Sequence, residues 1–188
     1  NSSLYPIKNP SAASVKWSNR HKGIGADGLV LIGKSTVADF SMRIFNADGS
    51  EAMMCGNASR CIGKFVYENA LTRKNEISLE TLSGIKRLML DVSNNKVKSV
   101  TVDMGTPSFS NPQQVATTDG SLHEKEFEVN GTTYYGTYIC MGNPHLVIWV
   151  EDVESVPLQD VGPLLESHPL FPEKTNVEFA VIKPDGNI

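Results

Sequence analysis

The sequence has few cysteines and no cluster of basic residues. Its three cysteines, Cys55, Cys61 and Cys140, cannot all pair, and Cys55 and Cys61 do not form a C-x-x-C motif. This content argues against a disulfide framework and a zinc or redox motif, and it fits a reducing compartment. The formal net charge is −4 and the Arg73-Lys74 pair is isolated, so nucleic acid and anionic membranes are not expected as partners.

The sequence also lacks a long hydrophobic run. The longest clear apolar run, Leu146 to Val150, is far too short to cross a bilayer, and the amino terminus shows no charged-then-apolar export signal. The hydrophobic content of 40% is ordinary for a globular protein. We therefore expect a soluble, cytoplasmic protein whose partner is a small molecule or another protein. A homodimer stays open.

In the first half, the pattern predicts a short helix, two strands and a longer helix. The strand Phe40 to Phe45 should place Phe40, Met42 and Ile44 on one face, because side chains alternate along a strand. From Ala58, apolar residues recur at helical spacing, which predicts a helix ending near Asn69 or Ala70 with one face in the core. The other predicted elements are a helix at Ser11 to Arg20 and a strand at Leu29 to Ile32, and the predicted core face of the longer helix is Cys61, Ile62, Phe65 and Val66.

Strands dominate the rest of the chain, so the pattern indicates an α+β fold rather than regular βαβ units. The segment Thr106 to Gly120 is rich in small polar residues and proline, and we interpret it as a connection between lobes. Asn130-Gly131 predicts a tight hairpin. The predicted strands are Glu76 to Leu82, Lys86 to Val92, Val97 to Met104, Phe127 to Val129, Thr133 to Cys140, Leu146 to Val150 and Phe179 to Ile182, with turns at Ser83-Gly84 and Asn94-Asn95 and a helix at Leu158 to His168. We expect a further strand beyond the turn-like residues 183–187.

The segment from Asn46 to Cys61 is the most informative part of the sequence. It places Cys55 between a polar turn and the expected start of a helix, where free backbone N–H groups and the helix dipole favour a thiolate. Cys55 could then carry a proton. A lone cysteine is more often a small buried hydrophobe, and this structural interpretation is kept for Cys61. For Cys55 the neighbours favour chemistry: Asn46, Asp48, Ser50 and Asn57 offer hydrogen bonds, and Gly56 leaves room for a ligand.

Three other motifs carry weaker signals. Gly23 to Gly28 lies before a strand instead of between a strand and a helix, so we interpret it as a turn and not as a dinucleotide loop. The loop Gly142 to His145 has an amide and an imidazole that could orient a ligand, although an Asn-Pro turn with a solvated histidine is the more frequent explanation of such a loop in isolation. Thr175-Asn176 alone is only a polar pair in a loop.

Taken together, these segments resemble the diaminopimelate epimerase family. The resemblance rests on Arg20 to Gly28, Arg43 to Cys61, Gly142 to His145, Gly162 to Pro172 and Thr175 to Phe179. It implies a cofactor-independent isomerase of lysine and cell-wall precursor synthesis, which interconverts LL- and meso-diaminopimelate. In that family one cysteine takes the α-proton and a second cysteine delivers a proton to the opposite face.

The resemblance also implies an architecture and a set of site residues. It predicts two similar lobes, each a curved, mostly antiparallel sheet wrapped around a central helix, with the site in the cleft between them. We expect residues 1–102 to form the first lobe and residues 103–188 to form part of the second, incomplete lobe. Cys55 matches the first family cysteine, and His145 is expected to tune the thiols. The substrate's ammonium and carboxylate groups would be bound by Asn46, Gly56, Asn57, Asn143 and Asn176.

The sequence departs from the family pattern at several points. The family's Gly-Asn-Asp turn has no counterpart before Asn1, and the second cysteine and the Glu-Arg pair would lie beyond Ile188. Gly28 stands where many members of the family have a substrate-contacting glutamine. Ala58-Ser59 stands where Gly-Ala is the commoner pair. We therefore expect these 188 residues alone to bind substrate weakly and not to epimerise it.

Two alternatives to an epimerase of this family stay open. One is a non-catalytic binding or structural relative on the same fold, in which Cys55 is merely a buried thiol. The other is a related isomerase. Proline racemases typically have histidine where this chain has Asn57, and isomerases of the phenazine pathway lack the cysteine.

Overall fold

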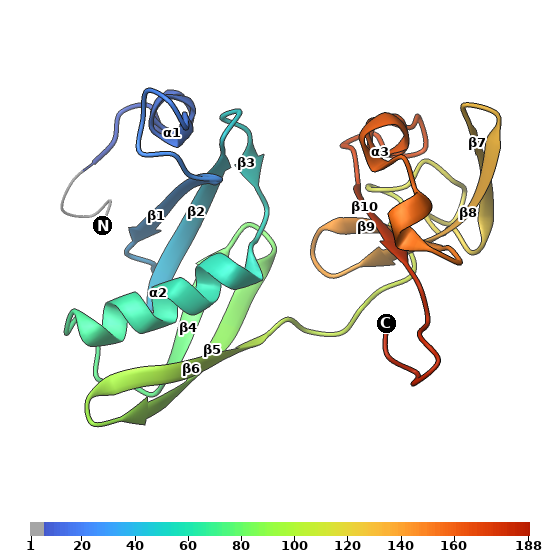
Figure 1. Ribbon diagram of the computed structural model, residues 1–188. Coiled ribbons are helices and arrows are strands. Elements are labelled where there is room, and N and C mark those ends of the chain that lie inside the picture. Colours follow the sequence, from blue (N-terminus) through green and yellow to red (C-terminus); the bar gives the residue numbers. More distant parts are fainter. Residues whose placement is uncertain (1–5) are drawn as a thin grey trace. The chain divides into compact units, whose positions relative to one another are not determined.

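A computed structural model describes residues 6–188 of the chain (Figure 1). The chain divides into two compact units between Gly105 and Thr106, each with its own hydrophobic core. Residues up to Gly105 form unit 1, and residues from Thr106 form unit 2. The lobe boundary expected at Val102 or Asp103 falls at the end of strand β6 (Lys96–Asp103), just before this division.

Unit 1 is built on a mixed sheet with the strand order β1-β2-β4-β5-β6, and β3 pairs with β2. All pairs in this sheet are antiparallel except the parallel pair of β2 and β4. Helix α2 contacts β5 and β6, and α1 contacts β1 and β2 (Figure 1). The elements are α1 (Pro10–Ser18), β1 (Gly28–Gly33), β2 (Phe40–Asn46), β3 (Glu51–Ala52), α2 (Gly56–Glu68), β4 (Glu76–Thr81), β5 (Gly84–Ser93) and β6 (Lys96–Asp103).

Helix α2 supplies the centre of the core of unit 1. Ile62 and Val66 are 2% and 0% exposed and pack with Met42, Leu79 and Leu88 from the sheet. The expected face of β2 is confirmed, since Phe40 and Ile44 pack against the same cluster as Met42.

The predicted core face of this helix is wrong in part. Cys61 is exposed and Phe65 is 42% exposed, whereas Ala58, Ser59 and Gly63 are buried. Compared with the prediction, the buried face of α2 is therefore rotated toward the small residues Ala58, Ser59 and Gly63. Gly63 explains this choice, because an added Cβ there would lie 3.1 Å from Val100 and 3.2 Å from Leu88, so the helix approaches β5 and β6 closely on that side.

Helix α1 ties the amino-terminal part of unit 1 to strand β2. Asn9 caps the helix by accepting a hydrogen bond from the N–H of Ala12, and Pro10 occupies the first turn, where its missing N–H leaves no hydrogen bond unmade. Ser14 is fully buried, and its Oγ hydrogen-bonds to the carbonyl oxygens of Phe45 at 2.9 Å and Asn46 at 2.8 Å. A helix residue thereby fixes the end of the strand that leads into the Asn46 turn.

Unit 2 contains a four-stranded sheet with the order β10-β9-β8-β7, in which only β9 and β10 are parallel. Helix α3 supplies Val161 and Leu165 to its core, together with Phe127, Tyr138 and Leu146 from the sheet. The elements are β7 (Lys125–Val129), β8 (Thr132–Cys140), β9 (Pro144–Trp149), the 3-10 turn η1 (Val153–Ser155), α3 (Leu158–Glu166) and β10 (Asn176–Ala180). The predicted α+β class with two sheets is confirmed.

The segment Thr106 to Gly120 is not a free connection, which corrects the sequence-based interpretation. Val115 is fully buried in the core of unit 2, Ser108 bridges to Cys140, and the N–H of Ala116 donates to the carbonyl of Leu170. Its prolines and small polar residues form turns that pack on the unit.

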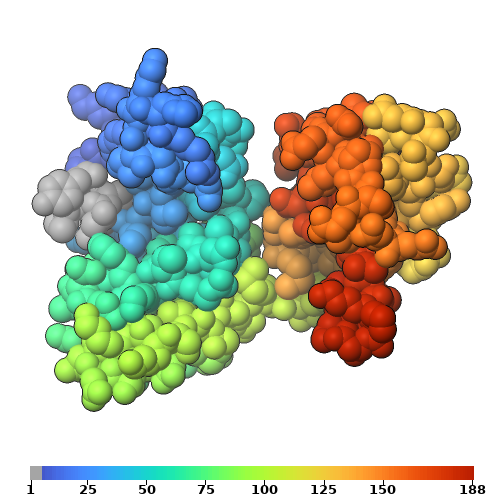
Figure 2. All heavy atoms as spheres, viewed as in Figure 1, coloured from blue at the N-terminus to red at the C-terminus, as the bar shows by residue number. Residues whose placement is uncertain are grey.

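Both predicted tight turns are confirmed by their backbone angles. Asn94 and Asn95 have φ values of 53° and 59°, and Asn130 and Gly131 have 53° and 76°. Positive φ at both central residues matches the twist of a two-residue hairpin. The space-filling view in Figure 2 shows the hairpin of β5 and β6, in light green, on the surface of unit 1. No helix within residues 6–188 is long and apolar enough to cross a membrane.

Candidate functional site

Cys55 is the N-cap residue of α2, as the sequence predicts. Its backbone is extended (φ −143°, ψ 115°), and its Sγ accepts the N–H of Ala58 at 3.5 Å. Its carbonyl accepts hydrogen bonds from the N–H and the Oγ of the fully buried Ser59, both at 3.0 Å. Cys55 is partly exposed and rests against the core of unit 1. The thiol is thus open on one side and held in place by the start of the helix.

The start of α2 offers further hydrogen-bond donors beside this thiol. In an α-helix the N–H groups of the first turn have no intrahelical acceptor, which applies here to Gly56 and Asn57. A Cβ at Gly56 would meet only ordinary contacts, the nearest being Met104 Sδ at 3.7 Å. The packing of unit 1 therefore does not require glycine at this position, because a methyl group would fit there without displacing a neighbouring atom.

Arg60 orients the side chain of Asn57, a contact that sequence reasoning missed. The guanidinium donates to Asn57 Oδ1 from one turn further along α2. Because its oxygen is engaged in this way, the amide of Asn57 is left with its NH₂ donors free for a partner. Spacing of three residues on a helix would have been the signal for this pair.

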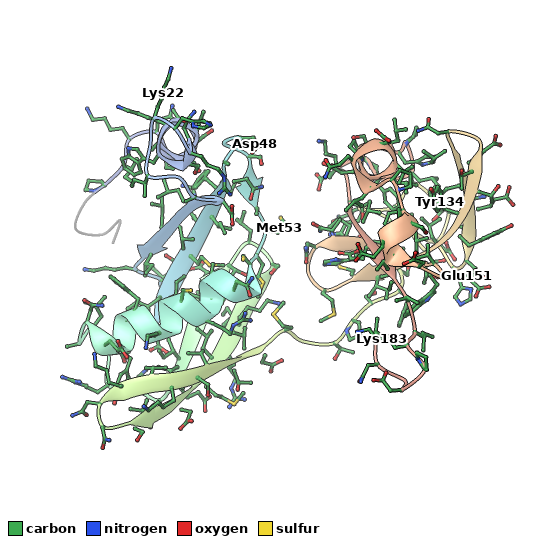
Figure 3. All side chains as sticks on the ribbon, viewed as in Figure 1. Lys22, Asp48, Met53, Tyr134, Glu151 and Lys183 are labelled. Atoms are coloured by element: carbon green, nitrogen blue, oxygen red, sulfur yellow. The ribbon has the colours of Figure 1, made fainter. Side chains whose placement is uncertain are left out.

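Asn46 belongs to a tight polar turn between β2 and β3. Its Nδ2 donates to Ser50 Oγ at 3.0 Å, and Ser50 Oγ donates to Asp48 Oδ1 at 2.6 Å. The chain then runs through Met53 into α2, as the labelled Asp48 and Met53 show in Figure 3. This order places Asn46, Cys55, Gly56 and Asn57 on one continuous segment of unit 1.

Gly28, which stands where relatives of the resembled family often have glutamine, is closely packed. A Cβ at this position would lie 2.4 Å from the carbonyl oxygen of Phe45, and Gly28 pairs with Asn46 in the sheet. A side chain could enter only if β1 and β2 moved apart. The close approach of the β2 backbone therefore explains why the chain has no side chain at position 28 that could contact a ligand.

In unit 2, His145 and Asn176 are register partners on the parallel strands β9 and β10. His145 Nδ1 lies 2.7 Å from Glu178 Oε1, and Asn176 Nδ2 donates to the carbonyl of Pro144 at 2.8 Å. The oxygen of the Asn176 amide is thus left as a free acceptor. Asn176 and Glu178 also lie on the wall of a groove of about 500 Å³ between α3 and β10.

Asn143 lies in the tight loop between β8 and β9. The carbonyl of Asn143 accepts the N–H of Met141 at 3.2 Å, and Gly142 has φ 97°. The N–H of Gly142 approaches Cys140 Sγ at 3.4 Å. The loop is therefore constrained, as the sequence predicts, with the Asn143 side chain partly exposed.

Cys140 packs against the core of unit 2, as expected for a structural cysteine. Next to it, burial first and the Cys140 thiol second raise the pKa of the Tyr138 hydroxyl well above its usual value. Tyr138 therefore stays protonated and donates to Gln114 Oε1 at 2.5 Å. Within residues 6–188, no group of three His, Cys, Asp or Glu side chains is arranged to hold a metal ion.

Two solved structures of similar fold are named as an epimerase and a racemase. The chain matches the hydroxyproline epimerase of Agrobacterium vitis with a TM-score of 0.68 at 19% identity, over 92% of this chain and 55% of that one. It matches a probable proline racemase of Agrobacterium radiobacter with a TM-score of 0.65 at 16% identity, over 97% of this chain and 57% of that one. At such identities the likeness defines the fold, which is that of an epimerase-like α+β protein.

Sequence comparison is more specific. The sequence model of diaminopimelate epimerase matches residues 6–110. The diaminopimelate epimerase of Phocaeicola vulgatus is 63% identical over 183 residues, covering 97% of this chain, and that of Parabacteroides distasonis is 59% identical over 186 residues, covering 98%. The chain belongs to the diaminopimelate epimerase family. It spans 65% of the length of each of these two relatives.

Proposed function

We propose that the protein is an epimerase of diaminopimelate and that Cys55 is the thiol that takes or returns the α-proton. The observation that carries this proposal is the position of Cys55 at the N-cap of α2, partly exposed and hydrogen-bonded to the N–H of Ala58. The first N–H groups of a helix have no intrahelical acceptor and can donate hydrogen bonds to a sulfur that takes or returns a proton. Membership of the diaminopimelate epimerase family supports diaminopimelate as the substrate of this thiol.

The difficulty of the reaction explains the donors around the thiol. An α-proton of an amino acid is a poor acid, and hydrogen bonds to the carboxylate must stabilise the charge that develops. A turnover of about 10 s⁻¹ requires a barrier near 16 kcal/mol. One positioned acid or base lowers the activation barrier by about 3–5 kcal/mol. Hydrogen-bond donors must therefore supply much of the further lowering of the barrier. We assign this role to the N–H groups of Gly56 and Asn57 and to the Asn57 amide.

The orientation of the amides suggests which charge each one meets. Asn57 presents NH₂ donors because Arg60 occupies its oxygen, so it suits a carboxylate. Asn176 presents its oxygen because Pro144 occupies its nitrogen, so it suits an ammonium group. Asn46 and Asn143 complete the proposed substrate contacts, and His145 is proposed to tune the thiol chemistry. Unit 1 would then be the lobe that carries Cys55, and unit 2 part of the second lobe.

Alkylation of the cysteines tests this proposal, and Cys61 is a matched control on the same helix. We expect iodoacetamide at pH 7 to modify Cys55 several-fold faster than Cys61, although Cys61 is the more exposed thiol. Diaminopimelate should protect Cys55 and not Cys61, and proline should protect neither. Peptide mass spectrometry gives the three rates separately. Equal alkylation rates for Cys55 and Cys61 would favour a structural thiol. Protection of Cys55 by proline alone would favour a proline racemase.

A further inference from the structure

The contact between His145 and Glu178 determines which ring nitrogen of His145 carries a proton. His145 Nδ1 lies 2.7 Å from Glu178 Oε1. An ionised carboxylate can only accept hydrogen bonds, so Nδ1 must be the donor. The neutral ring then has its lone pair on Nε2, because a neutral imidazole carries a single N–H.

Among the residues that the structure describes, His145 is the one hydrogen-bond partner of the Glu178 carboxylate. Glu178 Oε2 is buried and has no hydrogen-bond partner among the residues that the structure describes. The residue opposite His145 on β8 is the apolar Ile139, and Glu166 across the groove is paired with Lys174 at 3.1 Å. A buried carboxylate oxygen without a partner is destabilising. The side chain of Glu178 is 42% exposed to solvent, and His145 is the contact within the protein that stabilises its carboxylate.

The strand register keeps the two side chains together. Asn176 is opposite His145 in the parallel pair of β9 and β10. Side chains two residues apart on a strand lie on the same face, so Glu178 projects from the face of β10 that also carries Asn176. A carboxylate supplied by the neighbouring strand moves with the histidine, which makes the orientation of the ring independent of any loop.

We propose that Glu178 is a positioning residue that holds His145 in the Nδ1–H form, so that Nε2 is the nitrogen available to exchange a proton. This inference rests on the proposed function for the role of His145. The logic is that of a carboxylate behind a catalytic imidazole, which fixes the tautomer and stabilises the imidazolium when it forms. Glu178 itself touches neither substrate nor thiol in this scheme.

Nuclear magnetic resonance of the histidine rings tests the proposal without turnover. The chain contains four histidines, and His168 is a built-in control because its Nδ1 accepts the N–H of Leu170 at 3.2 Å. Long-range proton–nitrogen correlation spectra should therefore show His145 as the Nδ1–H tautomer and His168 as the Nε2–H tautomer. Glu178→Ala should shift His145 toward Nε2–H and leave His168 unchanged. Glu178→Gln can still accept through its amide oxygen and should retain Nδ1–H.

Two results would overturn the proposal: His145 as Nε2–H in the unmodified chain, or an Nδ1–H form that survives Glu178→Ala. If Glu178→Ala also alters His168, the fold has changed, and the spectra of the unmodified chain and of Glu178→Gln decide. In protein that exchanges the α-proton, Glu178→Ala should lower kcat by about 10–100-fold with KM within about twofold. Failure of diaminopimelate to protect Cys55 from alkylation would contradict the proposed function, whereas the ring spectra would still establish or refute the tautomer of His145.

Discussion

At the scale of single residues, two glycines near the candidate site have opposite reasons to be glycine. At Gly28 an added Cβ would collide with the backbone of β2 at 2.4 Å, whereas at Gly56 the nearest atom would be 3.7 Å away. The first glycine is required by the fold. The second is not, so its lack of a side chain is best explained by what approaches the start of α2 from outside.

Alanine substitutions separate these two reasons. Gly28→Ala should lower the free energy of unfolding by about 1–3 kcal/mol, because backbone must move to admit the methyl group. Gly56→Ala should change that free energy by no more than about 1 kcal/mol, since alanine favours a helix. The same change should nevertheless weaken the protection of Cys55 by diaminopimelate. Urea denaturation measures stability and alkylation measures protection. Undiminished protection in Gly56→Ala would contradict the proposal that a ligand approaches the backbone at Gly56.

The sequence could predict residues whose structure is determined locally. The N-cap position of Cys55 and the turns at Asn94-Asn95 and Asn130-Gly131 depend on neighbouring residues and are confirmed. The contact of His145 with Glu178 joins residues 33 positions apart, and it exists only because β9 and β10 pair in parallel. No local pattern in the sequence specifies that pairing, so Glu178 could not be found in advance.

At the scale of secondary-structure elements, α2 shows how a helical pattern can be correct in period and wrong in direction. Spacing of three and four residues connects Cys61 to Phe65 as well as Ile62 to Val66, and periodicity offers no means to choose between these neighbouring stripes. The structure buries the stripe of Ile62 and Val66, since Gly63 on the same side lets β5 and β6 approach closely. The burial of Val115 could not be predicted either, because a single apolar residue defines no periodic pattern.

A pair of substitutions on α2 tests this choice of face. Ile62→Ala should destabilise unit 1 by about 2–5 kcal/mol, as expected for a buried residue that leaves a cavity. Phe65→Ala should cost less than about 1 kcal/mol, because its ring is 42% exposed. Trp17 and Trp149 lie in different units, so urea denaturation of a Trp149→Phe background followed by fluorescence reports on unit 1. A larger loss for Phe65→Ala than for Ile62→Ala would contradict the assignment.

The junction between β2 and β4 depends on one carboxylate. Asp39 Oδ1 accepts from Lys74 Nζ at 2.5 Å, and Oδ2 accepts from the N–H and the Oγ of Ser78 at 2.9 Å and 3.0 Å. The hydrogen bond from Lys74, followed by that from the N–H of Ser78, lowers the pKa of Asp39. The folded state therefore holds this proton less tightly than the unfolded chain.

This shift predicts a loss of stability in acid. The contribution of Asp39 is complete above the ordinary aspartate value of about 3.9 and disappears as the pH falls through the lower folded value. We expect Asp39→Asn to remove about 1 kcal/mol at pH 7 and to flatten the fall in stability below about pH 4. Lys74→Met, which keeps the carboxylate, should give an intermediate slope. Urea denaturation at a series of pH values measures this, and parallel curves for Asp39→Asn and the unmodified chain would refute it.

At the scale of the whole molecule, the three cysteines differ in what their surroundings allow. Cys55 is partly exposed at a helix N-terminus, Cys61 is exposed further along α2, and Cys140 packs against a core. Inversion at a carbon needs a proton donor on the face opposite the base. Neither Cys61 nor Cys140 has the setting of a second acid–base thiol, so within residues 6–188 the proposal assigns this role to Cys55 alone.

Exchange of the substrate α-proton tests this conclusion directly. We expect the purified 188-residue chain in D₂O to produce no inversion of diaminopimelate, because a single thiol can return a proton only to the face from which it came. Nuclear magnetic resonance measures deuterium incorporation, and chiral chromatography measures the stereoisomers. Cys55→Ala should abolish any incorporation, and Cys61→Ala should leave it unchanged. Rapid incorporation with inversion would disprove the one-thiol description.

The buried hydroxyl of Ser14 has a consequence for protein engineering. Its two hydrogen bonds hold the carbonyls of Phe45 and Asn46 from a helix that contains none of the proposed ligand contacts. Libraries aimed at altered substrate preference would be designed around Cys55 and the neighbouring asparagines. Selected variants should also accumulate changes in α1, since Ser14 of that helix holds the carbonyls from which the Asn46 turn starts.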